Sequence, residues 1–386
     1  MNEKKPAPET HFPPRFIASE VYRSTTYGSS HPLGIPRVSL AMDLCRALGW
    51  LNEKNFVDSP RADKAALAGF HDAAYIDAIE IAERDGRLDL DVAQRHHIGI
   101  NGNPIFDGMY RRPATACGGG LYAARHLAAA DGIFYSPGGG QHHGRADHAS
   151  GFCYFNEPVL SIRELLANGI SRVFYVDFDA HHGDGVQDAF ADDPRVFTLS
   201  IHEAGRWPMV RGGGPGDAGG VDDRAGGVAL NMPVPEGFND SELEFLTESV
   251  VLPKIIEFAP DVIYVQAGSD ALADDPQSKL RLSNVALWRA VGLVAGATRR
   301  LLVSGGGGYN PYAVGRCWSG IWATLNGFEV PDQLPAKAEA LLREVNWQHR
   351  RGRQPFEHWM TTLADRPNPG PVRDAVREIA GKALTA

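Results

Sequence analysis

Residues 173–185, VFYVDFDAHHGDG, form an apolar run that ends in closely spaced acidic residues and histidines. A short run of β-branched and aromatic residues is typical of a buried strand, here predicted at 173–178. Similar runs recur at 16–18, 133–135, 196–201, 262–266 and 301–304. Segments with helical spacing of apolar residues separate them, at 38–51, 75–84, 120–130, 159–168, 241–258 and 284–299. This alternation predicts an α/β fold with one parallel sheet flanked by helices.

The domain organisation follows from the continuity of this pattern. No internal repeat and no long Ser/Gly linker interrupts it, so we predict one domain over residues 14–330. Residues 1–13 are rich in charge and proline and are expected to be flexible. Residues 331–386 are charged and are expected to form a peripheral helical extension. The composition, 43% hydrophobic and 22% charged, is that of a globular protein with a large core.

Charge and cysteine content exclude several functional classes. The chain has 38 Lys and Arg against 47 Asp and Glu, a net charge of −9, which argues against nucleic acid as a partner. No run approaches the roughly 18 apolar residues of a membrane span, and the first residues lack the apolar segment of a signal peptide. The 4 cysteines are widely spaced and fit a reducing compartment. We expect a cytoplasmic protein without membrane partners; homo-oligomerisation stays open.

The first candidate site lies where the 173–178 strand ends. Ligands of open parallel sheets bind beyond the carboxyl ends of the strands. Because side chains alternate along a strand, Asp177, Asp179 and His181 are expected to project to one side. Burying so many acids and histidines within a few residues requires a cation or mutual pairing.

A second predicted strand, 262–266, is followed by Asp270. Together with His181 and an acid from the first strand end, Asp270 would complete a set of two carboxylates and one imidazole. Three protein ligands leave a coordination position open, which is typical of a catalytic site for Zn²⁺ or Fe²⁺. Such an ion can polarise a carbonyl and acidify water.

Two further motifs indicate proton transfer and oxyanion stabilisation. His142 and His143 follow the glycines of PGGGQHHG, and each needs a carboxylate to fix its tautomer. Asp177 and Asp184 are the acids available for this role. Tyr309 follows the four glycines of SGGGGYN, where its hydroxyl can donate to a carbonyl oxygen that becomes negative. This glycine run is no phosphate loop, because no GK[ST] follows it.

These motifs resemble the histone deacetylase superfamily, and the resemblance covers about residues 14–330. The segments that carry it, in the order of the family, are HPLGIPR, HDAAYIDAIE, GGGQHHGRADHASGFCYFNE, YVDFDAHHGDGVQDAF, LSIHEAG, GSDALADDPQSKLRLSN and SGGGGYN. The details are most similar to bacterial acetoin-utilisation deacetylases and the class I enzymes. The resemblance implies the arginase/deacetylase fold and a metal-dependent amide hydrolase that deacylates N-acetyl-lysine or a small N-acyl amine.

The resemblance also implies residue roles. Asp179, His181 and Asp270 would hold the metal, Zn²⁺ or alternatively Fe²⁺, and Tyr309 would bind the carbonyl oxygen. His142 would be oriented by Asp177, and His143, the main proton shuttle, by Asp184. The substrate tunnel and the inner pocket that receives acetate would be lined by Gly151, Phe152, Gln277, Gly307 and Arg37. A potassium ion would bind Asp177, Asp179, His181, Ser200 and Ile201, mostly through backbone oxygens. A second, weaker potassium site would be framed by Phe190, Asp193, Val196 and Val228.

The mouth of the site departs from the family pattern. The loop that commonly carries a substrate-gripping aspartate reads HIGINGNPIFDG, with Asn101 and Asn103 instead. Gln277 replaces a usual apolar residue, and RWPMVRGGGPGD at 206–217 replaces FPGTG and offers Trp207 as a rim aromatic. We therefore expect acetylated histone-tail peptides to be no better substrates than short acetyl-lysine amides or other small N-acyl amines.

Two alternatives stay open at this stage. An arginase-type ureohydrolase would share the fold, but it needs two manganese ions and additional aspartates. A catalytically inactive acyl-ligand binding protein would have lost a metal ligand or the proton shuttle, whereas this sequence retains all of them.

Overall fold

The computed structural model describes residues 13–24, 27–209 and 218–385. Their backbone forms one sheet of eight parallel strands in the order β2-β1-β3-β8-β7-β4-β5-β6. The strands are β1 (Arg15–Ala18), β2 (Phe56–Asp58), β3 (Gly132–Ser136), β4 (Val173–Asp177), β5 (Val196–Glu203), β6 (Ala229–Val234), β7 (Val262–Gln266) and β8 (Arg300–Ser304). The predicted α/β fold, a parallel sheet flanked by helices, is confirmed.

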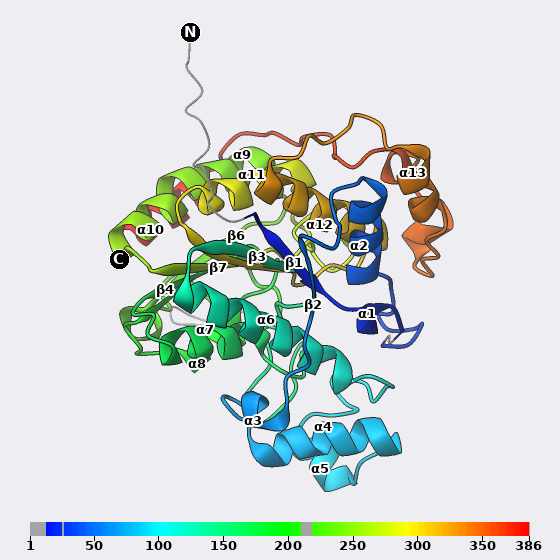
Figure 1. Cartoon of the computed structure of the whole chain (residues 1–386). Helices are drawn as coiled ribbons and strands as arrows, with labels where there is room; N and C mark the ends of the chain where they lie inside the picture. The colour runs from blue at the N-terminus through cyan, green and yellow to red at the C-terminus, as the bar shows by residue number, and fades with distance from the viewer. Residues whose placement is uncertain (1–12, 25–26, 210–217, 386) are drawn as a thin grey trace.

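Helices cover both faces of the sheet (Figure 1). The upper face in this view carries α2 (Val38–Ala47), α9 (Asp240–Leu246), α10 (Leu252–Phe258), α11 (Asn284–Ala295), α12 (Pro311–Asn326), α13 (Ala336–Arg343) and α15 (Asp374–Leu384). The lower face carries α6 (Arg111–Ala129), α7 (Glu157–Ala167) and α8 (Asp184–Ala189), with α3 (Lys64–Leu67), α4 (Ala73–Asp85) and α5 (Leu90–Arg95) below them. The short helices are α1 (Val21–Ser24), α14 (His358–Thr361), the 3₁₀ turns Ala225–Gly227 and Arg350–Arg353, and a π turn, Thr247–Val251, between α9 and α10.

The central strands are apolar on both sides because helices cover both faces. In β4 all five residues are buried. Phe174 and Val176 belong to the upper apolar cluster, whereas Val173 and Tyr175 belong to the lower one. Burial of each such side chain contributes roughly 1.5–3 kcal/mol, so the sheet holds rigidly the polar residues that follow its strands.

The main differences from the sequence prediction concern two strands and the start of one helix. The prediction omits β2 and β6, which are the two edges of the sheet. Helix α6 begins at Arg111 rather than at 120. Gly120 reflects close packing of α6 against α7, since a Cβ on Gly120 would lie 2.0 Å from Glu157 Oε1. Within the described part of the chain, no helix is both long and apolar enough to span a membrane.

The C-terminal segment packs on the same core as the rest of the chain. Its buried side chains Trp359, Leu363 and Val376 join the upper apolar cluster. Arg316 of α12, completely buried, donates from Nε to the Thr362 carbonyl at 2.7 Å. Its Nη1 lies 2.8 Å from Asp365 Oδ1, an ion pair that is poorly aligned for a hydrogen bond. The expected flexibility of residues 1–13 concerns residues that, except for residue 13, lie outside the described ones.

We expect Asp365→Ala to lower the free energy of unfolding by about 3 kcal/mol, because it leaves the buried Arg316 guanidinium without its counter-charge. Chemical denaturation measures this loss. Arg289→Gln serves as the control. Arg289 pairs with Glu244 and Glu248, but its side chain is 55% exposed, so these ion pairs should contribute less than about 1 kcal/mol to the free energy of unfolding. Equal effects of the two substitutions would show that the Arg316–Asp365 pair does not hold the tail.

Candidate active site

The chemistry-bearing residues follow four neighbouring strands, β3, β8, β7 and β4, at their carboxyl ends. Three of these residues form the metal-ligand candidate. Ligand atoms of Asp179, His181 and Asp270 all lie within 4.8 Å of one another. The His181 Nδ1 is 2.8 Å from Asp270 Oδ2 and 3.1 Å from Asp179 Oδ1. The predicted set of two carboxylates and one imidazole is thus assembled from two strand ends.

The electrostatics of this cluster fit a cation. The side chains of Asp179 and Asp270 are 1% and 0% exposed, so two carboxylates lie side by side out of water. Burial disfavours the charged imidazole, but Asp270 and Asp179 outweigh this and raise the pKa of His181 to about 10. Burial and the neighbouring Asp179 raise the pKa of Asp270 to about 6. A divalent ion would supply the positive charge that this pair of carboxylates requires. The oxygen and nitrogen donors suit Zn²⁺ or Fe²⁺.

His142 is paired with the carboxylate at the end of β4. Its Nδ1 lies 2.7 Å from Asp177 Oδ2, which also accepts a hydrogen bond from the Tyr175 hydroxyl at 2.7 Å. Burial favours the neutral ring, but Asp177 and Asp179 outweigh it and raise the pKa of His142 to about 9. The structure therefore forms the His142–Asp177 pair that the resemblance implies.

His143 is paired with the first residue of α8. Its Nδ1 lies 2.7 Å from Asp184 Oδ1, and the imidazole is 4% exposed. Burial and the adjacent His142 lower the pKa of His143 to about 3. Two neighbouring imidazoles, with ring centroids 3.9 Å apart, thus favour opposite protonation states.

Tyr309 is fixed through its own backbone N–H, and its hydroxyl makes no hydrogen bond to a described residue. Its N–H donates to Asp275 Oδ2 at 2.7 Å, whereas no described residue hydrogen-bonds its hydroxyl. In the preceding loop, Gly307 donates its N–H to Asp179 Oδ2 at 2.6 Å, and a Cβ there would lie 2.0 Å from Asp270 Oδ2. Only glycine allows the loop to approach the metal-ligand cluster so closely.

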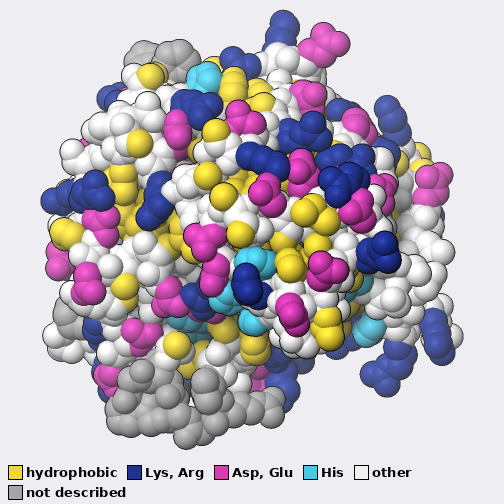
Figure 2. Space-filling view, turned by 90° about the horizontal axis from the view of Figure 1, so that it is seen from below, with side chains coloured by type: hydrophobic (Ala, Val, Ile, Leu, Met, Phe, Trp, Pro, Cys, Tyr) yellow, Lys and Arg dark blue, Asp and Glu magenta, His cyan; other side chains and the backbone are white. Residues whose placement is uncertain are grey.

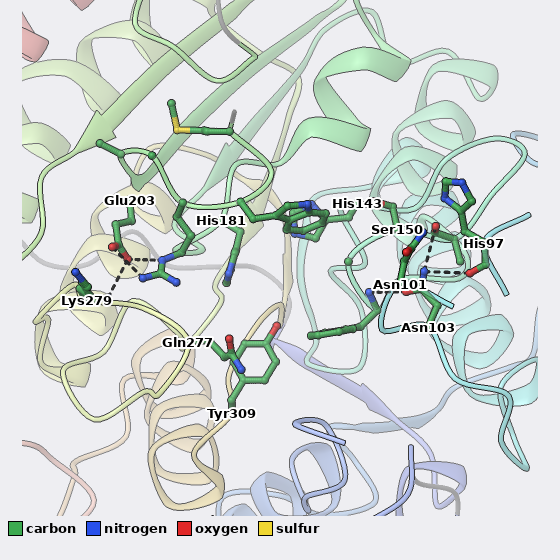
Figure 3. A pocket seen from close by; sticks show the side chains of 18 of the residues that line it. His97, Asn101, Asn103, His143, Ser150, His181, Glu203, Gln277, Lys279 and Tyr309 are labelled. Carbon is green, nitrogen blue, oxygen red and sulfur yellow. Dashed lines mark hydrogen bonds and ion pairs between the residues drawn. The ribbon is translucent and has the colours of Figure 1, made fainter. Parts of the chain in front are cut away.

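Two cavities meet at these residues. The outer one, about 980 Å³, is the mouth (Figure 3). The inner one has a volume of about 40 Å³ and is lined in part by Arg37 and Asp179. Residues shared by both cavities are His143, Gly151, Phe152, His181 and Tyr309. His143, the metal-ligand candidate His181 and the free phenol of Tyr309 therefore surround the passage between the two cavities.

Comparisons with known proteins show which family and which fold this chain is similar to. Residues 31–325 match the histone deacetylase domain. The putative histone deacetylase 2 of Caenorhabditis elegans is 33% identical over 89% of this chain, which spans 64% of that relative's length. The acetoin utilization protein AcuC of Bacillus subtilis is 30% identical, over 83% of this chain and 84% of that protein. A crystal structure of an HDAC homologue from Aquifex aeolicus, 35% identical, aligns with a TM-score of 0.89 over 96% of this chain and 100% of that one.

The chain belongs to the histone deacetylase family. Deacetylation is the activity that this relationship supports, and the arginase/deacetylase fold of the family is the fold seen here. In this deacetylase the described residues contain one group of three metal-ligand candidates, Asp179, His181 and Asp270. The two-metal ligand set that an arginase-type ureohydrolase needs is therefore not found in the described part of the chain.

The mouth of the deacetylase has two unlike walls (Figure 3). One wall is ionic: Glu203 accepts from Arg206 at 2.9 Å, and Lys279 Nζ lies 2.8 Å from Glu236 Oε2. The other wall carries histidine, asparagine and serine side chains, namely His97, Asn101, Asn103, His148 and Ser150. Both carboxylates of the described lining are thus paired with a cation.

The rim residues predicted from the sequence fall into two groups. Gln277 lines the mouth, and Trp207, 50% exposed, lies edge-on to His143 with ring centroids 4.8 Å apart. Asn101 lines the mouth with its side chain free of described partners. Asn103 instead is 1% exposed; it donates to the His97 and Ala149 carbonyls and accepts from Phe152 N–H at 2.9 Å. Asn103 therefore supports the tunnel wall. Residues 210–217 of the predicted rim segment lie outside the described ones.

The residues implied for potassium lie on adjacent strands. Asp177 of β4 is in register with Ser200 of β5, next to Ile201. Ser200 Oγ lies 2.8 Å from His202 Nδ1. Phe190, Asp193, Val196 and Val228 lie around the turn between α8 and β5 and the start of β6.

Sequence reasoning missed several residues that fix this site. Asp275, 1% exposed, binds both Tyr309 N–H and, at 2.8 Å, Gln277 N–H. Asn156 donates to the Gly144 carbonyl at 2.9 Å, which ties down the loop after His143. The resemblance motifs contain both residues, but Asp275 binds Tyr309 from 34 residues away, and the Asn156 N–H binds His71 from 85 residues away. Figure 2 shows basic and acidic side chains interspersed over one face of the protein, without a large basic patch for nucleic acid.

Proposed function

We propose that this deacetylase is a zinc-dependent amide hydrolase that removes acetyl groups from N-acetyl-lysine or from small N-acyl amines. The observation that carries the proposal is the convergence of one metal-ligand set, two histidine–aspartate pairs and a free tyrosine hydroxyl on one cavity junction. These are the parts that amide hydrolysis requires: an activated nucleophile, an oxyanion donor and an acid.

The chain's own residues have distinct tasks in this reaction. When bound, the metal polarises the amide carbonyl and lowers the pKa of water. Tyr309 donates its hydroxyl hydrogen to the carbonyl oxygen as that oxygen becomes negative. Asp184 holds the proton on His143 Nδ1, which leaves Nε2 to take a proton from the attacking water. His143 then returns this proton to the leaving amine nitrogen. The charged imidazole of His142, paired with Asp177, stabilises the negative charge that develops on the reacting carbonyl group.

Two further assignments belong to this proposal. Arg37 binds acetate in the inner cavity: its Nη1 is held by the Gly306 carbonyl at 2.8 Å, while its buried Nε has no partner among the described residues. A potassium ion binds Asp177, Asp179, His181, Ser200 and Ile201 and fixes the end of β4. A second potassium ion binds at Phe190, Asp193, Val196 and Val228.

The lining of the mouth favours a small polar substrate over a peptide. Both carboxylates in its described lining are already paired with cations, so they offer no free charge for a polycationic tail. Gln277 and Asn101 offer amide groups to a polar substrate, and Asn103 is occupied in the tunnel wall. Interactions away from the reacting bond decide between peptide and small-molecule substrates.

We expect kcat/KM for acetylated histone-tail peptides not to exceed that for short acetyl-lysine amides or other small N-acyl amines. Gln277→Leu should lower kcat/KM for the small substrates about 5-fold, the effect of losing one hydrogen bond. Gln94→Leu, at an exposed position of α5, is the matched control. A strong wild-type preference for long peptides that Gln277→Leu leaves unchanged would contradict the assignment of the mouth. Absence of turnover with every substrate would contradict the hydrolase itself and favour an inactive acyl-binding protein.

A further inference from the structure

Arg145 lies directly behind the His143–Asp184 pair, outside both cavities. Its Nη2 binds Asp184 Oδ2, and its Nη1 binds Asp188 Oδ2. Asp184 Oδ1 meanwhile holds His143 Nδ1 at 2.7 Å and Gly185 N–H at 2.9 Å. The two oxygens of this carboxylate therefore have separate donors. Oδ1 accepts from His143 and Gly185, whereas Oδ2 accepts from the Arg145 guanidinium.

The backbone of Arg145 is fixed independently of its side chain. His71 Nδ1 donates to the Arg145 carbonyl at 2.9 Å, while His71 Nε2 accepts from Asn156 N–H at 2.9 Å. Asn156 also donates to the Gly144 carbonyl at 2.9 Å. Because His143 and Arg145 are two residues apart on this held loop, the guanidinium and the imidazole reach the same carboxylate from fixed positions.

The charge distribution suits a carboxylate that must stay ionised beside a proton-transferring ring. Burial alone would raise the pKa of Asp184, but His143 and Arg145 outweigh it and lower that pKa below its ordinary value. The side chain of Arg145 is 23% exposed and that of Asp188 58% exposed, so the guanidinium connects the buried pair to the surface. Asp188 contacts neither His143 nor the cavities.

We propose that Arg145 is a positioning residue for catalysis: it clamps the outer oxygen of Asp184, so that the inner oxygen keeps the His143 tautomer and ring orientation that proton transfer needs. The inference rests on the proposed role of His143. Without the clamp, the Asp184 carboxylate can rotate, and the imidazole loses its fixed direction. Outer partners that orient metal-ligating imidazoles typically contribute about 10–100-fold to activity, and we expect an effect of that order for the imidazole of His143.

The test compares three single variants of the metal-loaded enzyme on a short acetyl-lysine amide. Arg145→Met, which keeps length but removes charge and donors, should lower kcat at least about 10-fold with KM within about 2-fold. Arg145→Lys should restore most of this loss, because an ammonium still supplies one charged donor to Asp184. Asp188→Asn removes only the outer contact and should leave kcat within about 2-fold.

A double variant separates positioning from a merely structural role. In the His143→Ala background, Arg145→Met should have no further effect on kcat, because the group it positions is absent. Wild-type kcat in Arg145→Met, or an equal loss in the His143→Ala background, would overturn the inference. If His143→Ala itself keeps full activity, the proposed function of His143 fails instead. If Arg145→Met does not fold, Arg145→Lys provides the test. A kcat of Arg145→Lys at or below a tenth of the wild-type value, with a wild-type kcat in Asp188→Asn, would contradict a clamp that needs only charge.

Discussion

Asp270→Asn is expected to release the divalent metal from the protein and to abolish turnover. The set of Asp179, His181 and Asp270 has no redundancy, because each residue supplies one of three ligand groups. The substitution removes a full negative charge from a site that is completely buried, and the amide oxygen that remains is a neutral and weaker ligand for Zn²⁺ or Fe²⁺. His181→Ala should have the same two effects for the same reason.

Metal content per chain after gel filtration, measured together with kcat, checks this expectation. Asp188→Asn is the control, since it removes a carboxylate from α8 without touching the three ligands. Reloading the chelated wild type with Zn²⁺ or with Fe²⁺ identifies the ion that restores activity. Full activity after exhaustive chelation, or an unchanged metal content in Asp270→Asn, would contradict the metal assignment.

The fold was predictable where strands are buried on both faces. β4, β7 and β8 lie inside the sheet, so their sequences are continuous apolar runs that periodicity detects. β2 and β6 form the edges: β2 has three residues, none fully buried, and β6 includes Asn231 and Pro233. β2 therefore buries little apolar surface, whereas β6 is largely buried, but its apolar run is interrupted by Asn231 and by a proline that an edge strand tolerates.

The candidate site shows a similar limit. Clustered charged side chains, such as those among residues 177–184, give a recognisable signal in the sequence, because burying so much charge without a function is costly. Single polar residues do not, since their role depends on partners that only the fold supplies. Asp275 acts on Tyr309, 34 residues away, and Arg145 on Asp184, 39 residues away. The sequence predicts Asn103 at the rim, but its side chain points inward and accepts a hydrogen bond from the Phe152 N–H.

Tyr309→Phe and His143→Ala should each lower kcat by at least about 100-fold while the metal stays bound. Tyr309 lies at the junction of the two cavities with a hydroxyl that no described residue uses, so removing one oxygen atom removes only the donor aimed at the carbonyl oxygen. Loss of one such donor costs about 100–1,000-fold in kcat. Loss of a positioned acid–base group such as His143 costs about 100–10,000-fold.

Steady-state kinetics and metal analysis on the same preparations check these two variants. Tyr312→Phe is the matched control: it deletes a hydroxyl three residues further on, one that donates to the Val345 carbonyl at 3.0 Å and lies away from both cavities. Its kcat should stay within about 2-fold of wild type. Wild-type kcat in Tyr309→Phe would remove Tyr309 from the mechanism, because the carbonyl oxygen would then be stabilised without it. A matching loss in Tyr312→Phe would show that the effect arises from disturbed packing rather than from oxyanion stabilisation.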